Sequence, residues 1–77
     1  MDIQVLITEI ALALEISESE ITPESDSSMI EEWDSLGHIS ILARLDQTFD
    51  NITEKLPDLA SALSVSEMHK LLTGGGL

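Results

Sequence analysis

The sequence predicts an all-α fold: a small bundle of three longer helices and one short helix. Two observations support this prediction. Apolar residues recur at the spacing of one helix face in three separate stretches, and no stretch reads convincingly as a strand. The chain has 77 residues, of which 43% are hydrophobic and none is cysteine, so packing alone must hold it together. We expect a single domain over residues 1–73, followed by a flexible tail over residues 74–77.

The first helix is expected over residues 2–15. Its apolar residues follow the i, i+3, i+4, i+7 rule of one helix face: Ile3, Leu6, Ile7, Ile10 and Leu14. From residue 17 to residue 34 the periodicity gives way to Ser, Glu, Asp, Thr and Pro. This composition predicts a long loop between the first and second helices, anchored to the core by Ile21, Met29 and Ile30. Loops of this length usually carry a function.

The second helix is expected over residues 35–49, and its apolar stripe is the strongest in the chain: Leu36, Ile39, Leu42, Ala43, Leu45 and Phe49. We expect this stripe to face the core. Pro57 suits the first position of a short third helix that runs to about Ala62, because its fixed φ is helical and its missing N–H would be unpaired there. Ser64 and Glu67 form the pattern of a capping box, which predicts a last helix that buries Val65, Met68, Leu71 and Leu72.

The charge is strongly acidic. Fifteen Asp and Glu residues face three Lys and Arg residues, for a net charge of −12, and ten acidic residues precede the first cation, Arg44. Electrostatic repulsion therefore disfavours nucleic acids and anionic membranes as partners and favours basic protein surfaces. Asp2 stands where a secretory signal needs a basic residue, and no apolar run approaches the length of a membrane span. We expect a cytoplasmic monomer that does not insert into membranes.

Metal sites are not expected. Windows that start at Glu24 and Asp46 place acidic residues at some calcium-ligand positions, but both lack the central glycine of an EF-hand loop and its closing glutamate. His38 and His69 are the only histidines, and no cysteine joins them to make a zinc site.

A catalytic triad of Ser35, His38 and Asp34 is conceivable, because residues at i and i+3 are neighbours on a helix. However, no nucleophile elbow or oxyanion hole accompanies these residues, and the chain is too short to wall off a reaction pocket. We therefore expect His38 to face the solvent and the chain not to be an enzyme.

Ser35 has two interpretations at the start of the second helix. It could be the N-cap, which is the common role of a serine at this position. Alternatively, Asp34 caps the helix, and Ser35 becomes the first helical residue with its hydroxyl free and near the positive end of the helix dipole. Leu36 would then turn into the core.

The tripeptide Asp34-Ser35-Leu36, placed at the start of a second helix after a long acidic loop, resembles the attachment motif of acyl carrier proteins of the stand-alone bacterial type. The resemblance extends over most of the chain. It implies that a phosphopantetheinyl transferase attaches a 4′-phosphopantetheine arm from coenzyme A to Ser35. The thiol of the arm would carry an acyl or aminoacyl group as a thioester for fatty-acid, polyketide or another specialised pathway. The alternative is an unmodified acidic helical module that binds basic protein surfaces.

The resemblance also suggests where partners and cargo would lie. Acyl-transferring or acyl-activating enzymes with basic patches would dock on Glu31, Glu32, Asp46 and Asp50, while Trp33 either pins the loop to the bundle or touches the partner. The second helix departs from the fatty-acid type, because it has Gly37, Ser40, Gln47 and Thr48 where acids are common. An acyl chain that folds back into the bundle would be lined by residues that are also core candidates: Ile39, Leu42, Ala43, Phe49, Leu59, Leu63 and Met68.

Overall fold

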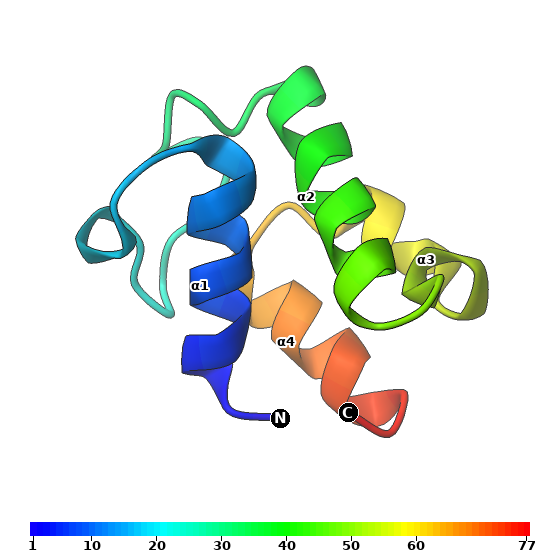
Figure 1. Cartoon of the computed structure of the whole chain (residues 1–77). Coiled ribbons are helices and arrows are strands. Elements are labelled where there is room, and N and C mark those ends of the chain that lie inside the picture. The colour runs from blue at the N-terminus through cyan, green and yellow to red at the C-terminus, as the bar shows by residue number, and fades with distance from the viewer.

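Four α-helices and two 3₁₀ helices form the chain in the computed structural model, which describes residues 1–77 (Figure 1). The elements are α1 (Ile3–Leu14), η1 (Glu18–Glu20), α2 (Ser35–Thr48), α3 (Ile52–Lys55), η2 (Pro57–Ser61) and α4 (Val65–Gly74). There is no strand, and the bundle measures 28 × 23 × 18 Å. The predicted all-α bundle and its long connection between the first two long helices are confirmed.

Side chains immediately before each long helix satisfy its free N–H groups. The Asp2 carboxylate accepts from the Gln4 N–H at 2.9 Å before α1. The Ser64 hydroxyl accepts from the Glu67 N–H at 3.1 Å before α4. The predicted capping box at α4 is therefore only half formed, since the Glu67 carboxylate does not return a bond to Ser64. The complete capping box lies at η1, where Ser17 and Glu20 bond each other's backbone N–H groups.

The connection between α1 and α2 is fixed to the bundle at several points. Ile21 and Ile30 are buried, as predicted, whereas Met29 is 65% exposed, so its prediction as an anchor was wrong. The structure adds a different tie that the sequence does not signal. An isolated antiparallel bridge forms between Asp26 and Ser64, and in it the Ser27 N–H donates to the Leu63 carbonyl at 2.9 Å. This bridge joins the middle of the loop to the start of α4.

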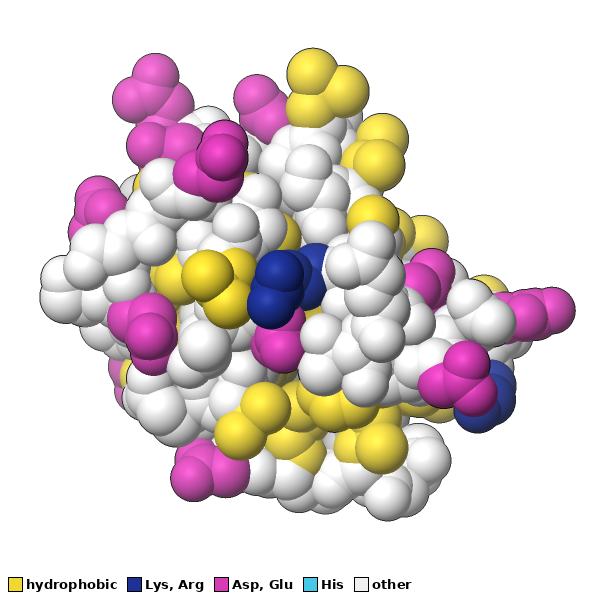
Figure 2. All heavy atoms as spheres, viewed as in Figure 1, with side chains coloured by type: hydrophobic (Ala, Val, Ile, Leu, Met, Phe, Trp, Pro, Cys, Tyr) yellow, Lys and Arg dark blue, Asp and Glu magenta, His cyan; other side chains and the backbone are white.

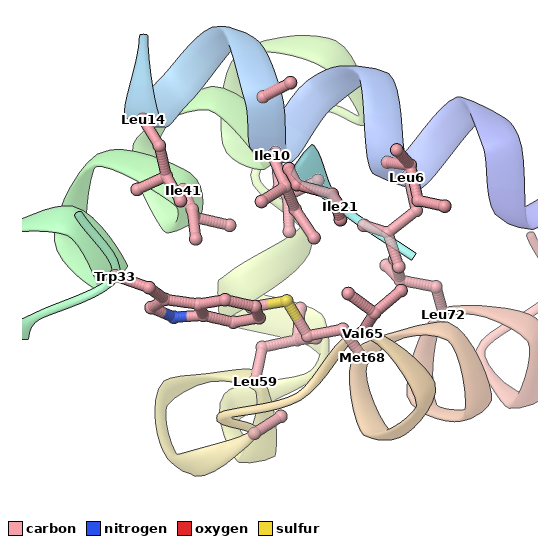
Figure 3. Packing of buried hydrophobic residues seen from close by; sticks show 14 of the residues in the cluster. Leu6, Ile10, Leu14, Ile21, Trp33, Ile41, Leu59, Val65, Met68 and Leu72 are labelled. Carbon is pink, nitrogen blue, oxygen red and sulfur yellow. The ribbon is translucent and has the colours of Figure 1, made fainter. Parts of the chain in front are cut away.

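The core is one hydrophobic cluster to which α1, α2, α4, η2 and the loop all contribute. Figure 3 shows the Trp33 ring reaching from the loop into this cluster, between Ile41 of α2 and Leu59 of η2, with Met68 at its far edge. Trp33 is only 2% exposed. Of the two interpretations of Trp33, the loop anchor is therefore the one that the structure shows.

The buried face of α2 matches the predicted one only in part, because Leu45 is fully buried as expected but other members of the predicted stripe are not. Its fully packed residues are His38, Ile41 and Leu45. Leu36 and Ile39 are instead 76% and 61% exposed, so the prediction that they enter the core was wrong. Both sets satisfy helical spacing, so periodicity alone could not choose between them. The set that faces the core includes His38, and both nitrogens of its ring have partners there.

The segment after α2 is more helical than predicted. The short helix expected over 57–62 is the 3₁₀ helix η2, which begins at Pro57 as expected, and an additional α-helical turn, α3, precedes it. Asp50 and Asn51 both have a positive φ, 53° and 58°, which reverses the chain between α2 and α3. Asp46 stabilises this reversal, because its two carboxylate oxygens accept from the N–H and hydroxyl of Thr53, both at 2.8 Å.

The two ends of the chain meet beside α4 (Figure 1). The N-terminal ammonium of Met1 donates to the Leu77 carbonyl at 2.6 Å, and the Leu77 N–H donates to the Leu72 carbonyl at 3.0 Å. Helix α4 extends to Gly74, one residue beyond the predicted domain boundary. The flexibility of the tail stays a prediction.

Candidate functional site

Ser35 is the first residue of α2, and its side chain is exposed. The Asp34 carboxylate accepts from the Gly37 N–H at 2.8 Å, and the Asp34 carbonyl accepts from the His38 N–H at 2.8 Å. Asp34 is therefore the N-cap of the helix, and this interpretation of the pair is confirmed. The Ser35 hydroxyl forms no hydrogen bond within the chain. It therefore does not cap the helix, as a serine at this position usually does.

A chain of two hydrogen bonds lies directly behind Ser35. The indole Nε1–H of Trp33 donates to Nδ1 of His38 at 3.0 Å, and Nε2 of His38 lies 3.0 Å from the Leu59 carbonyl oxygen. An indole N–H only donates and a carbonyl only accepts, so His38 is neutral here and carries its proton on Nε2. The two ring planes are 11° apart. This chain links the loop, α2 and η2.

The expectation that His38 faces solvent was wrong, since the ring is only 7% exposed. A histidine near polar residues is normally predicted to lie on the surface. No pattern in the sequence predicts that Trp33 and the Leu59 carbonyl provide partners for both of its nitrogens. The same two bonds prevent His38 from acting as a base toward Ser35, because neither nitrogen is free to accept the hydroxyl proton.

Gly37 allows the loop to approach α2 closely. A Cβ built on Gly37 would lie 2.0 Å from the backbone oxygen of Glu32 and 2.9 Å from a methyl carbon of Leu14. The space beside Gly37 is filled by the chain's own backbone. The residue thus positions the segment that leads into Ser35.

A surface groove of about 530 Å³ has Ser35 among its lining residues. It is lined by Ser27, Trp33, Asp34, Ser35, His38, Ile39, Leu42, Ala60 and Leu63. Three of the predicted cargo-lining residues are among these: Ile39, Leu42 and Leu63. The other predicted lining residues are not. Leu59 and Met68 are fully buried in the core, Phe49 is half-buried, and Ala43 is exposed outside the groove.

Besides His38, two lining residues were missed by sequence reasoning, Ser27 and Ala60. Ser27 lies beside the groove because its N–H bonds the Leu63 carbonyl across the isolated bridge. No local pattern predicts a contact between residues so far apart in the sequence. Ala60 lines the groove because it lies in η2. The only sign of this element in the sequence was Pro57, at which it begins.

The predicted docking residues fall into two groups. Glu31 and Glu32 are exposed just before the start of α2, close to the exposed side chains of Leu36 and Ile39. Figure 2 shows hydrophobic side chains protruding at this end of α2, with acidic side chains close by.

Asp46 and Asp50 lie toward the other end of α2, roughly 20 Å away along the helix axis. The Asp46 carboxylate is already engaged by Thr53, whereas Asp50 is exposed. Arg44, which adds a positive charge to α2, forms the single ion pair of the chain with Glu9 of α1. The structure therefore leaves the acidic groups around Ser35 without a cationic partner from the chain itself.

No cluster of three or more His, Asp or Glu side chains is arranged to hold a metal ion. None of the helices has the length and hydrophobicity needed to cross a membrane. No protein-family model matches the chain, and neither a curated protein nor a solved structure was found to match it. What the fold defines is a small all-α bundle with a groove beside an exposed serine.

Proposed function

We propose that the chain is an acyl carrier protein and that Ser35 is its site of 4′-phosphopantetheine attachment. One observation carries the proposal: the Ser35 hydroxyl is exposed and uncommitted at the start of α2, because Asp34 caps the helix in its place. Since Asp34 performs the capping, the start of α2 does not need the Ser35 hydroxyl.

The electrostatics around Ser35 support a phosphodiester there. The first N–H groups of α2 and the helix dipole present partial positive charge at this end, which stabilises a phosphate by about 0.3–1 kcal/mol at an exposed site. In the attachment, the Ser35 oxygen bonds to the phosphorus of coenzyme A that bears pantetheine, and adenosine 3′,5′-bisphosphate leaves.

The groove beside Ser35 supports the role of a carrier. A flexible arm attached at its rim would rest against Ile39, Leu42 and Leu63 rather than in water. The acyl or aminoacyl group would be attached to the thiol of the arm, which supplies the sulfur that the chain lacks. In this proposal the chain carries the group through the cytoplasm and its partner enzymes perform the chemistry.

The acidic side chains near Ser35 support docking of partners with basic surfaces. Glu31 and Glu32 are exposed and unpaired, and Leu36 beside them offers an apolar contact. These partners are a phosphopantetheinyl transferase and enzymes that transfer or activate acyl groups. Charge complementarity of this kind raises association rates more than affinity.

The test is to incubate the purified chain with coenzyme A, magnesium and a broad-specificity phosphopantetheinyl transferase and then to measure the mass of the chain. We expect a gain of one phosphopantetheine that is lost in Ser35→Ala and kept in Ser40→Ala, a matched serine on the exposed face of α2. If the gain persists in Ser35→Ala, the assignment of Ser35 is wrong.

The second candidate is an unmodified acidic module that binds basic proteins, which the exposed Leu36 and Ile39 beside Glu31 and Glu32 favour. No mass gain with several transferases, together with salt-sensitive binding to a basic partner, would support this module instead.

A further inference from the structure

The floor of the groove beside Ser35 is formed by Trp33 and His38. Both residues line the groove, yet they are 2% and 7% exposed, so only their edges reach it. Behind them lie Leu59 and Met68, which are fully buried and do not line the groove. Trp33 is itself a member of the core cluster, so on this side it is the Trp33–His38 pair that connects the groove lining with the buried residues.

The hydrogen bond between His38 and the Leu59 carbonyl crosses from α2 to η2. A molecule passing from the groove into the core between these two elements would have to break this bond. It would leave the buried Leu59 carbonyl and the His38 Nε2–H without partners, which is unfavourable in an apolar interior. At present every buried polar side-chain atom in the bundle has a partner.

The other wall of the groove is fixed as well. The Ser27 N–H bonds the Leu63 carbonyl, and the Val65 N–H bonds the Ser25 carbonyl at 3.1 Å, so the loop cannot move away from the start of α4 without losing both bonds. The groove is thus preformed, and its depth is set by the Trp33–His38 floor.

We propose that His38 is a positioning residue that seals the core against the occupant of the groove, and that the occupant is the group attached at Ser35. The identity of the occupant rests on the function proposed above, whereas the seal does not. With the core closed, the carried group stays on the surface. The groove then suits short acyl or aminoacyl groups, because a long alkyl chain would project into water.

The seal is tested first on the unmodified chain. Trp33 is the only tryptophan, so acrylamide quenching of its fluorescence reports access to the floor of the groove. We expect several-fold stronger quenching, and binding of an apolar fluorescent dye, in His38→Ala. The amide of His38→Gln can both accept and donate, so this variant should restore protection. Ile39→Ala widens the groove without touching the two bonds and should leave Trp33 protected. Equal quenching in the wild-type chain and His38→Ala would overturn the seal.

The cargo is tested on chains loaded at Ser35 with a butanoyl or a hexadecanoyl arm. Methyl NMR signals of Ile39, Leu42 and Leu63 should shift with both groups, while the Met68 methyl signal of the wild-type chain should not. A Met68 shift with the hexadecanoyl group would overturn the proposal even if His38→Ala does not fold. Absence of any mass gain at Ser35 would instead refute the carrier function and the occupant with it, and the quenching experiment would still decide the seal.

Discussion

The backbone oxygen of Glu32 lies 2.0 Å from the position that a Cβ on Gly37 would occupy. The last residues of the loop therefore rest directly on the first turn of α2, and only glycine permits this packing. The contact fixes the path of the chain on both sides of Ser35.

Gly37→Ala should consequently destabilise the chain. Alanine favours a helix over glycine by about 1 kcal/mol, but overpacking against a backbone atom costs about 1–3 kcal/mol. We expect a net loss in the free energy of unfolding, measured by urea denaturation. Gly74→Ala is the matched control, because nothing lies within 4 Å of a Cβ at that helical position. If Gly37→Ala is as stable as Gly74→Ala, the close approach of the Glu32 carbonyl to Gly37 is contradicted.

The ion pair between Arg44 and Glu9 joins α2 to α1 in a chain with a net charge of −12. Arg44→Gln should lower the free energy of unfolding more than Glu9→Gln does, because it removes the pair and also one of three cations. A double-mutant cycle should give a coupling of about 0.2–1 kcal/mol that shrinks with salt. Glu24→Gln serves as a control for charge alone, and a coupling of zero would show that the pair contributes nothing.

Asp46→Ala should lower the free energy of unfolding by about 0.5–2 kcal/mol, as the loss of a capping residue does. The reason is that both carboxylate oxygens hold Thr53 at the start of α3. Asp50→Asn should leave stability unchanged, since asparagine tolerates the positive φ of this residue and Asp50 is exposed. Thermal denaturation of both variants is the measurement. Equal stability of the two would show that Asp46 has no structural role.

Stability should also depend on pH through Asp26. The hydroxyl of Ser28, and then its N–H, bond the Asp26 carboxylate and lower the pKa of Asp26 below its ordinary value of 3.8. The ionised form is therefore favoured in the folded chain. Its contribution to stability is complete above the unfolded pKa and is lost as the pH falls through the lower folded pKa.

NMR titration of the Asp26 carboxyl carbon measures this effect directly. Ser28→Ala should raise the pKa of Asp26 toward its ordinary value, while Ser40→Ala should not change it. An unchanged Asp26 titration in Ser28→Ala would mean that the two side chains do not interact in solution.

Salt should raise the melting temperature of the wild-type chain. The acidic groups greatly outnumber the cations, and one ion pair forms, so screening reduces net repulsion in the folded state. Magnesium chloride should produce the same rise at lower concentration than sodium chloride. A melting temperature that stays flat or falls between low and moderate salt would contradict this explanation.

The sequence predicted what depends on local rules. The three long helices, the choice of Asp34 as one of two possible caps and the Pro57 start follow from capping and backbone preferences that act over a few residues. The buried face of α2 could be predicted only in part, because Leu36 and Ile39 fit the helical period as well as His38 and Ile41 do. The buried position of His38 involves partners from the loop and from η2, which no local pattern reveals.

The sequence identified the central residue of the candidate site but not the residues that surround it. Ser35 and its capping neighbour Asp34 are found in the tripeptide Asp34-Ser35-Leu36. The groove, by contrast, is assembled from the loop, α2, η2 and the segment before α4. Contacts such as Ser27 with Leu63, or Glu32 with Gly37, join backbone atoms, and backbone contacts leave little trace in side-chain patterns.

Three consecutive residues before Ser35 each make their own bond or contact with the first turn of α2: Glu32 through its carbonyl, Trp33 through its indole and Asp34 through its carboxylate. The backbone that leads into Ser35 is therefore held in one place. On the proposed function, the enzyme that modifies Ser35 would not have to order this segment, so the entropic cost of recognition would fall on the partner and on the arm.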